Sequence, residues 1–289
     1  MKLTRQSRDA WYKFLNNVDN VGHAQREILK NDIDQHVNLC MESAINMTKG
    51  LQADLPDNFN PKSILEIGSS AGLNCYALKQ VYPVAKVYGI EPEKEAVNVA
   101  ISMDADGQLI EFLQGIGEDL PFKDNSVDLI IIHTVIEHVQ DVKQVIKELS
   151  RVLTETGIIH LNAPNYVWPH EPHLRIWTLP FLGKKFVKLS AIMQGKKNQV
   201  DFINHLKFVT PFNLEKEFIR RELIWINRAE IKVYSAINND FAIKKYKKLS
   251  AALQLFDKLK LAKIIARLII FLGLYPSVMY TLCKNKFQQ

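Results

Sequence analysis

The chain has 289 residues, a formal net charge of +6 and a pI of about 9.0, with 47% hydrophobic and 24% charged residues. These proportions exclude a disordered or fibrous chain and allow a substantial core. The three cysteines, Cys40, Cys75 and Cys283, are too widely spaced for a zinc motif, a disulfide framework or an iron–sulfur cluster.

The beginning of the chain has the loose apolar spacing of helices, so we expect a helical N-terminal extension over residues 1–55. The opening residues, MKLTRQSRDAWYKF, lack the apolar stretch of a signal peptide. We therefore expect a cytoplasmic protein.

A regular alternation of strands and helices follows. The expected strands are Ser63–Ile67, Lys86–Ile90, Leu109–Leu113, Val127–Ile132 and Ile158–Ala163, and the expected helices are Leu73–Tyr82, Glu93–Met103 and Asp141–Leu153. Such alternation predicts right-handed βαβ units and a sheet covered by helices on both faces. The predicted fold is α/β, a Rossmann-like doubly wound and mainly parallel seven-stranded sheet with helical N-terminal and C-terminal extensions.

The alternation breaks after the fifth strand. Residues from about 165 to 207 are rich in proline, histidine and aromatic residues, and we interpret them as an acceptor-side insertion in a domain spanning 56–240. Thr210-Pro211 then begins a helix, and Glu222–Ile226 and Ile231–Ala236 resemble the last strands. Residues 241–289 are expected to form a basic, then apolar, helical tail.

Ligands of doubly wound sheets bind beyond the carboxyl ends of the strands. After the first strand, Glu66–Gly72 (EIGSSAG) has small residues that let a ligand approach the backbone, and the following helix start favours negative charge. Ser70 takes the middle position of a G-x-G-x-x-G pattern and the third glycine is missing, which argues against a dinucleotide. Glu91 ends the second strand, where a carboxylate can accept hydrogen bonds from ribose hydroxyls.

Two more segments follow strands: Gly115–Phe122 (GIGEDLPF) and His133–His138 (HTVIEH). In this order and spacing the four segments resemble the class I S-adenosylmethionine-dependent methyltransferases with a type 11 or type 23 methyltransferase domain. The resemblance covers about Ser63 to Asn165 and implies S-adenosyl-L-methionine as the cofactor.

The resemblance also implies roles for single residues. It places Gly68, Ser70 and Gly72, in the loop that Glu66 begins, beside the methionine part of the cofactor, and Glu91 at the ribose. It places Ile116 and Gly117 beside the adenine and His133 beneath the sulfonium. Ile116 stands where the family often has an aspartate, a role that Glu118 or the backbone would then take.

The sulfonium methyl is activated by the cofactor itself. The protein has to align an acceptor, exclude water and, for a hydroxyl acceptor, remove a proton. We expect transfer to an oxygen of a small-molecule or lipid-linked acceptor, with a histidine as candidate general base. The candidates are His138, His173 and His205.

Some quinone-pathway relatives hold a divalent ion with two carboxylates and a histidine after the fourth strand. Thr134 stands where the first of these carboxylates would be, so we expect no metal. Glu137 and His138 are either catalytic or a hydrogen-bonded pair that supports the loop.

Two other functions stay open. The Ala163–Tyr166 segment (APNY) follows the fifth strand rather than the fourth, no Pro-Cys pair exists and no aromatic-basic module is visible, which argues against nucleic acid as the acceptor. A nucleic-acid or protein methyltransferase is nonetheless one alternative. The other is a cofactor-binding but inactive partner module, because Ser70 and Ile116 depart from the family pattern.

The tail offers a further hypothesis. Lys258–Leu272 is basic and amphipathic, and Leu268–Leu282 is uncharged but short for a bilayer span. Such a segment can lie on an anionic membrane, here the inner face, or can pack against the domain. The sequence predicts no oligomeric state.

Overall fold

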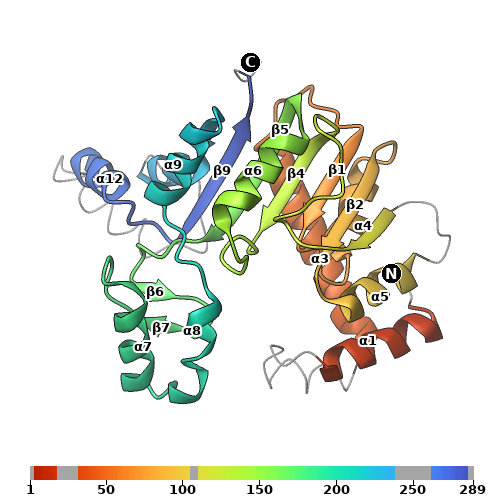
Figure 1. Ribbon diagram of the computed structural model, residues 1–289, viewed down its shortest axis with the longest axis horizontal. Coiled ribbons are helices and arrows are strands. Elements are labelled where there is room, and N and C mark those ends of the chain that lie inside the picture. Colours follow the sequence, from red (N-terminus) through yellow and green to blue (C-terminus); the bar gives the residue numbers. More distant parts are fainter. Residues whose placement is uncertain (1–2, 18–31, 105–109, 238–261, 286–289) are drawn as a thin grey trace. The chain divides into compact units, whose positions relative to one another are not determined.

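The computed structural model describes residues 3–17, 32–104, 110–237 and 262–285 (Figure 1). The chain divides into two compact units. The first contains residues 1–132, 147–160 and 283–289, and the second contains residues 133–146 and 161–282. None of the described helices is both long and apolar enough to cross a membrane.

The first unit is built on parallel strands that end within one or two residues of the predicted bounds. They are β1 (Ser63–Ile67), β2 (Lys86–Glu91), β3 (Ile110–Gln114) and β4 (Val127–His133). β1 pairs in parallel with β2 and with β4, and β2 pairs in parallel with β3. β1 and β4 are almost continuously apolar and buried, as strands covered on both faces are.

Seven strands form one sheet in the order β3-β2-β1-β4-β5-β9-β8. The last three are β5 (Leu153–Pro164), β8 (Ile224–Asn227) and β9 (Ser277–Cys283). The predicted mainly parallel, seven-stranded Rossmann-like sheet is thereby confirmed.

Helices α4 (Leu73–Val81), α5 (Lys94–Met103) and α6 (Val142–Val152) begin and end close to the predicted helices. The described residues of the N-terminal extension form the expected helices, with α1 (Arg5–Asn17) against α5 and α3 (Ile33–Gln52) against α4 (Figure 1). Trp11, Leu15 and Val37 of the extension pack on Val99 and Met103. Each such buried side chain contributes roughly 1.5–3 kcal/mol, so the extension is part of the first unit's core.

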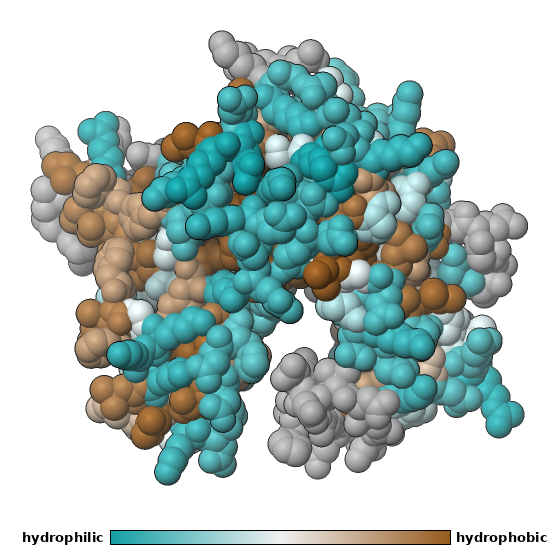
Figure 2. Space-filling view, in the orientation of Figure 1, coloured by the Kyte–Doolittle hydropathy of each residue, from teal (hydrophilic) through white to brown (hydrophobic). Residues whose placement is uncertain are grey.

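The second unit contains the predicted insertion. β6 (His170–Glu171) and β7 (Ile176–Trp177) form an antiparallel hairpin, followed by α7 (Gly183–Met193), a 3-10 turn η1 (Lys197–Gln199) and α8 (Phe202–His205). Leu174, Ile176, Val187, Ala191 and Ile203 form their shared core. Between Trp177 and Met193 many large apolar side chains stay exposed, and brown side chains gather over α7 in Figure 2.

The next helix, α9 (Pro211–Arg220), begins where the sequence predicts it. Thr210 is its N-cap and forms a reciprocal capping box with Asn213.

Two predictions for the end of the chain are wrong. The expected strand Ile231–Ala236 lies in a helix, α10 (Arg228–Ile237), because Ala229 and Val233 are buried at helical spacing and Asn227 accepts hydrogen bonds from the first N–H groups. The expected helical tail contains α12 (Ala262–Phe271), but Ser277–Cys283 is the strand β9. Residues 241–261 and 286–289 of the tail lie outside the described residues.

The sequence pattern does not separate the strand β9 from the helix α12, because one apolar run covers both. Gly273, with φ +64°, ends the helix, and Pro276 precedes the strand. A short apolar run alone does not distinguish a helix from a strand.

Candidate active site

The loop between β1 and α4 has the geometry of a ligand-binding turn. Gly68, Ser70 and Gly72 all have positive φ angles, of 70°, 47° and 79°. The N–H groups of Gly68 and Ser69 both donate to the carbonyl of Ile90, at 2.8 and 3.0 Å. Gly72 is the N-cap of α4 and supplies no side-chain cap, and an uncapped helix N-terminus is a place where anionic groups bind.

Gly72 has a second reason to be glycine. A Cβ atom at this position would lie 2.6 Å from Cζ of Phe112 and 2.9 Å from Cβ of Ala100. The loop therefore depends on a residue without a side chain both for its φ angle and for packing.

Ser70 and Glu91 are brought together by this turn. Oε2 of Glu91 accepts a 2.9 Å hydrogen bond from the Ser70 N–H, and Oε1 accepts one of 3.1 Å from the Glu93 N–H. Burial raises the pKa of Glu91, against the effect of these two hydrogen bonds. The side chain of Ser70 is exposed, so the serine at the middle glycine position does not obstruct the turn.

Glu66 lies below the loop and is 2% exposed. Its carboxylate accepts a hydrogen bond of 2.8 Å from Nδ2 of Asn74 and one of 3.0 Å from Sγ of Cys75. Burial raises the pKa of Glu66 to about 7. The contacts join the end of β1 to the first turn of α4.

The segment after β3 contains the residues assigned to the adenine side. Ile116 bridges to Asp119 and is 45% exposed, Gly117 is buried and Glu118 is half-buried. Arg151 fixes the chain just beyond them, because its guanidinium donates to the carbonyls of Leu120 and Phe122. Sequence reasoning missed Arg151, although its spacing from Glu148, with which it forms an ion pair, is a recognisable signal.

His133 is the last residue of β4, is half-buried and belongs to the second unit. Thr134 follows with φ +53°, and its N–H donates to the carbonyl of Asn162 at 2.7 Å. This turn leads directly to Glu137 and His138.

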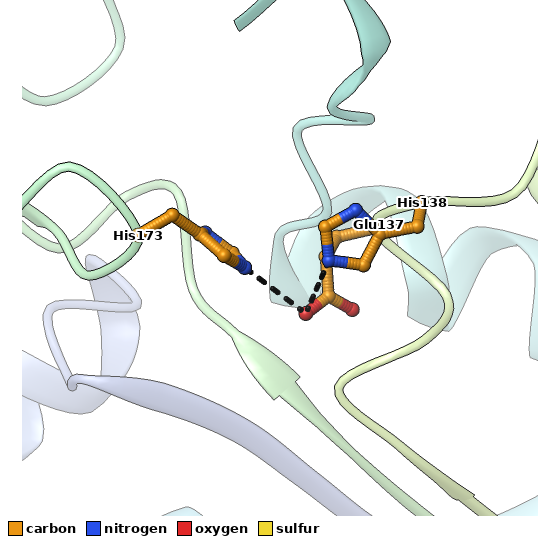
Figure 3. Close-up of side chains that lie close together, drawn as sticks. All are labelled: Glu137, His138 and His173. Atoms are coloured by element: carbon orange, nitrogen blue, oxygen red, sulfur yellow. Dashed lines mark ion pairs between the residues drawn. The ribbon is translucent and has the colours of Figure 1, made fainter. Parts of the chain in front are cut away.

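Two of the three predicted histidines meet at one carboxylate (Figure 3). Nε2 of His138 and Nε2 of His173 lie 3.9 and 4.0 Å from the same oxygen, Oε1 of Glu137, which is fully buried. Phe202 flanks both imidazole rings, at 6.1 and 5.4 Å between centroids. His205, the third candidate, ends α8 with an exposed side chain and lies outside this cluster.

Glu171 orients His173. Its Oε1 lies 2.6 Å from Nδ1 of the imidazole, and its carboxylate also accepts from the backbone N–H groups of His173 and Leu174. Sequence reasoning did not assign Glu171 to this site, because a carboxylate two residues before a histidine is not by itself a signal for pairing.

The neighbouring charges shift the pKa values of His138 and His173 in opposite directions. Burial alone would lower the pKa of His173, but the hydrogen bond to Glu171 and the charges of Glu171 and Glu137 outweigh burial and raise it. Burial and the neighbouring His173 lower the pKa of His138. His173 is therefore the stronger base of the two.

Burial raises the pKa of Glu137 to about 7. Among the described residues, neither oxygen of Glu137 has a hydrogen-bond partner, and the same is true of the buried hydroxyl of Tyr166. Buried polar groups are nearly always hydrogen-bonded, so these atoms are suited to a bound molecule that donates to them.

The same cluster has the donor types of a cation site. Ligand atoms of Glu137, His138 and His173 lie within 4.8 Å of one another. A tetrahedral zinc site, with bonds near 2.1 Å, places its ligand atoms about 3.4 Å apart, so the imidazoles would have to move inward to hold such an ion.

Known proteins similar to this chain agree with the fold. Residues 65–161 match a family model described as a methyltransferase domain. The chain is 34% identical over 96 residues to the uncharacterized methyltransferase YcgJ of Bacillus subtilis (strain 168). This match covers 32% of this chain and 37% of that protein. It is 31% identical over 150 residues to a demethylmenaquinone methyltransferase of Lactococcus lactis subsp. lactis (strain IL1403), covering 48% of this chain and 59% of that protein.

Among solved structures, the plantazolicin methyltransferase BpumL in complex with SAH has a TM-score of 0.51 and 15% identity, covering 98% of this chain and 95% of that one. This likeness concerns the fold. The chain spans 37%, 57% and 59% of the length of the first three curated relatives that it matches.

The segment from 65 to 161 is thus a methyltransferase domain, and its sheet and glycine turn define the doubly wound class of such domains. The match and the fold place this segment among the class I S-adenosylmethionine-dependent methyltransferase domains. The cofactor of that class is S-adenosylmethionine.

Proposed function

We propose that this protein transfers the methyl group of S-adenosylmethionine to an oxygen of a small-molecule or lipid-linked acceptor, with His173 as the general base. The observation that carries the proposal is the Glu171–His173 pair. Because Nδ1 of the imidazole is held at 2.6 Å by a carboxylate, its proton stays on that side and Nε2 keeps its lone pair.

The reaction is then an in-line displacement. The acceptor oxygen forms a bond to the methyl carbon while the carbon–sulfur bond breaks, and the electron pair of the broken carbon–sulfur bond returns to sulfur. The proton of the acceptor hydroxyl passes to Nε2 of His173. Raising the basicity of His173 is what Glu171 contributes.

Glu137 and Tyr166 supply acceptor binding in this proposal. Both are buried groups with unused hydrogen-bonding capacity among the described residues. A hydroxyl-rich acceptor would donate to the carboxylate of Glu137 and accept from the phenol of Tyr166. His138 lies 3.9 Å from the carboxylate of Glu137 and has the lower basicity of the histidine pair.

For the cofactor, we propose the roles that the family resemblance implies. Gly68, Ser70 and Gly72 border the methionine part above Glu66, and Glu91 accepts from the ribose. On the other side of the cofactor, Ile116, Gly117 and Glu118 border the adenine, and His133 lies on the sulfonium side. Each carboxylate oxygen of Glu91 accepts one hydrogen bond from a backbone N–H group and keeps a further lone pair. This free capacity to accept hydrogen bonds supports the proposed ribose contact.

The test is transfer of labelled methyl from S-adenosylmethionine to fractionated small-molecule and lipid extracts. Wild type should label one fraction, His173→Ala should lose labelling while still binding S-adenosylhomocysteine in calorimetry, and His205→Ala is the matched control that should keep it. Unchanged labelling by His173→Ala would remove His173 from the mechanism. Absence of cofactor binding by wild type would overturn the proposal altogether.

The same assay separates the alternatives. Label in nucleic acid or protein would replace the acceptor class, and cofactor binding without any transfer would assign an inactive partner module. Treatment with EDTA should leave the rate unchanged. A rate lost with EDTA and restored by one divalent cation would assign Glu137, His138 and His173 to a metal instead.

A further inference from the structure

The chain between Trp177 and Met193 exposes an unusual amount of apolar surface. We call it the α7 surface; its members are 42–78% exposed and are Trp177, Leu179, Phe181, Leu182, Phe186, Leu189, Ile192 and Met193. Isolated exposed apolar residues are ordinary, but a contiguous patch marks a site of interaction. Brown side chains are visible over this part of the molecule in Figure 2.

The α7 surface is not the side by which α7 packs. Val187 and Ala191 point into the core that the helix shares with the β6–β7 hairpin and Ile203. Leu182, Phe186, Leu189 and Met193 recur at spacings of four and three residues, which places them together on the opposite face of the helix. A helix that packs on one side only normally has polar residues on the other.

The charge of this segment is one-sided. Residues 172–200 contain six basic residues and no acidic one, which equals the formal net charge of the whole chain, +6. Of the five lysines here, Lys184 and Lys188 donate to Asn204, and none pairs with a carboxylate of the described residues. Burial, together with the charges of Lys207 and Lys188, lowers the pKa of Lys184, as expected of positive charges without counter-charges.

We propose that the α7 surface docks on an anionic phospholipid membrane. The exposed face of α7 has leucine and phenylalanine with the exposed Lys185 beside them, and Arg175, Lys196 and Lys197 flank the helix in the chain. An apolar helix face with basic residues around it is the kind that lies in the bilayer interface. Trp177, 65% exposed at the end of β7, is suited to the headgroup level, where tryptophan is enriched. An apolar protein partner would not require six basic residues without a single acidic one.

Docking would also orient the cluster that contains His173. His170 pairs with Trp177 across the hairpin, His173 lies in the turn between them, and Phe202 packs on both His173 and the core below α7. Docking of the α7 surface on a membrane is independent of the proposed reaction. A lipid-linked rather than a soluble acceptor follows from docking only if the proposed function holds, and in that one respect the inference rests on the proposed function.

The direct experiment is flotation of the full chain with vesicles of phosphatidylcholine, with or without phosphatidylglycerol. Wild type should float with the anionic vesicles and remain behind with the neutral ones. The triple variant Leu182→Ser, Phe186→Ser, Leu189→Ser should partition at least about tenfold less, because its apolar anchor is gone. Replacing Lys185 and Lys197 by Gln should cost about fivefold each.

Matched controls come from equally exposed residues elsewhere. Leu39→Ser, Val84→Ser, Ile101→Ser removes three apolar side chains that are 53–79% exposed in the first unit, and should float like wild type. Ile264→Ser, Leu268→Ser does the same on α12 and tests the tail hypothesis. All variants should keep the thermal midpoint of wild type, since each changes exposed positions.

Several outcomes would overturn the proposal. They are no flotation of wild type with anionic vesicles, equal flotation of the α7 triple variant, and loss only in the α12 variant. A wild-type dimer that the triple variant converts to a monomer, without vesicle binding, would assign the α7 surface to a second copy of the chain.

Trp177 provides a second readout. On mixing with anionic vesicles its fluorescence should shift to shorter wavelength and be quenched by brominated lipid, and Trp177→Phe should abolish the change while flotation persists. An unchanged response in Trp177→Phe would place the lipid contact elsewhere.

Discussion

Gly72→Ala tests whether the turn after β1 is as constrained as its geometry indicates. Two costs combine. The residue has φ +79°, where a side chain costs about 1–2 kcal/mol. The added Cβ would meet Phe112 at 2.6 Å and Ala100 at 2.9 Å, and overpacking of this kind costs about 1–3 kcal/mol. The free energy of unfolding should therefore fall by roughly 2–5 kcal/mol.

A second glycine isolates the packing part. Gly195 has φ +77° and nothing within 4 Å of an added Cβ, so Gly195→Ala should lose only about 1–2 kcal/mol. The entropy that alanine removes from the unfolded chain is the same in both variants and cancels. The difference between them, about 1–3 kcal/mol, is the packing cost at Gly72.

Urea unfolding of wild type and both variants measures the two losses. Calorimetry with S-adenosylhomocysteine should also show weaker binding by Gly72→Ala and unchanged binding by Gly195→Ala. If the two variants lose the same free energy of unfolding, contact of an added Cβ with Phe112 and Ala100 has no packing cost, and the explanation for glycine at this position is wrong.

Three other substitutions test the carboxylates beside the histidine pair and at the proposed ribose site. Glu171→Gln should lower the transfer rate about a hundredfold or more and move the rising limb of its pH profile to lower pH, since Glu171 raises the pKa of His173; an unmoved limb would contradict this. Glu91→Gln should weaken S-adenosylhomocysteine binding about tenfold or more in calorimetry, and unchanged affinity would remove Glu91 from the ribose site. Glu137, with a folded-state pKa raised to about 7, contributes stability that is present below pH 4.5 and lost as the pH rises through 7. Glu137→Gln should hence be more stable than wild type in urea at pH 8, by up to on the order of 3 kcal/mol, but not at pH 4.5; a gain independent of pH would contradict the assignment.

The first half of the fold was readable from the sequence because each signal there is local. Ser63–Ile67 and Val127–His133 are mainly apolar runs. Later in the chain, Thr210-Pro211 is a helix start with its own capping residue. The end of the chain was not readable in the same way. Ser277–Cys283 becomes a strand because neighbouring strands pair with it, and that pairing leaves no local pattern.

The candidate site divides along similar lines. Positions after strands identified the glycine turn, Glu91 and the segment from His133 to His138. Which histidines meet depends on how the insertion folds, and His138 and His173 are far apart in sequence. The raised basicity of His173 follows from a 2.6 Å contact with Glu171, a contact that residue spacing alone does not predict.

The exposed α7 surface illustrates a further limit. Its leucines and phenylalanines have the spacing of an ordinary core-facing helix, and only the folded unit shows that Val187 and Ala191 are the buried pair.

The most direct test of the proposed reaction is methyl transfer itself. Wild type and His173→Ala are incubated with labelled S-adenosylmethionine and fractionated small-molecule and lipid extracts, and the label in each fraction is counted. Wild type should label a small-molecule or lipid fraction, and His173→Ala should leave that fraction at the level found without enzyme. Label confined to other fractions, or equal label with His173→Ala, would contradict it.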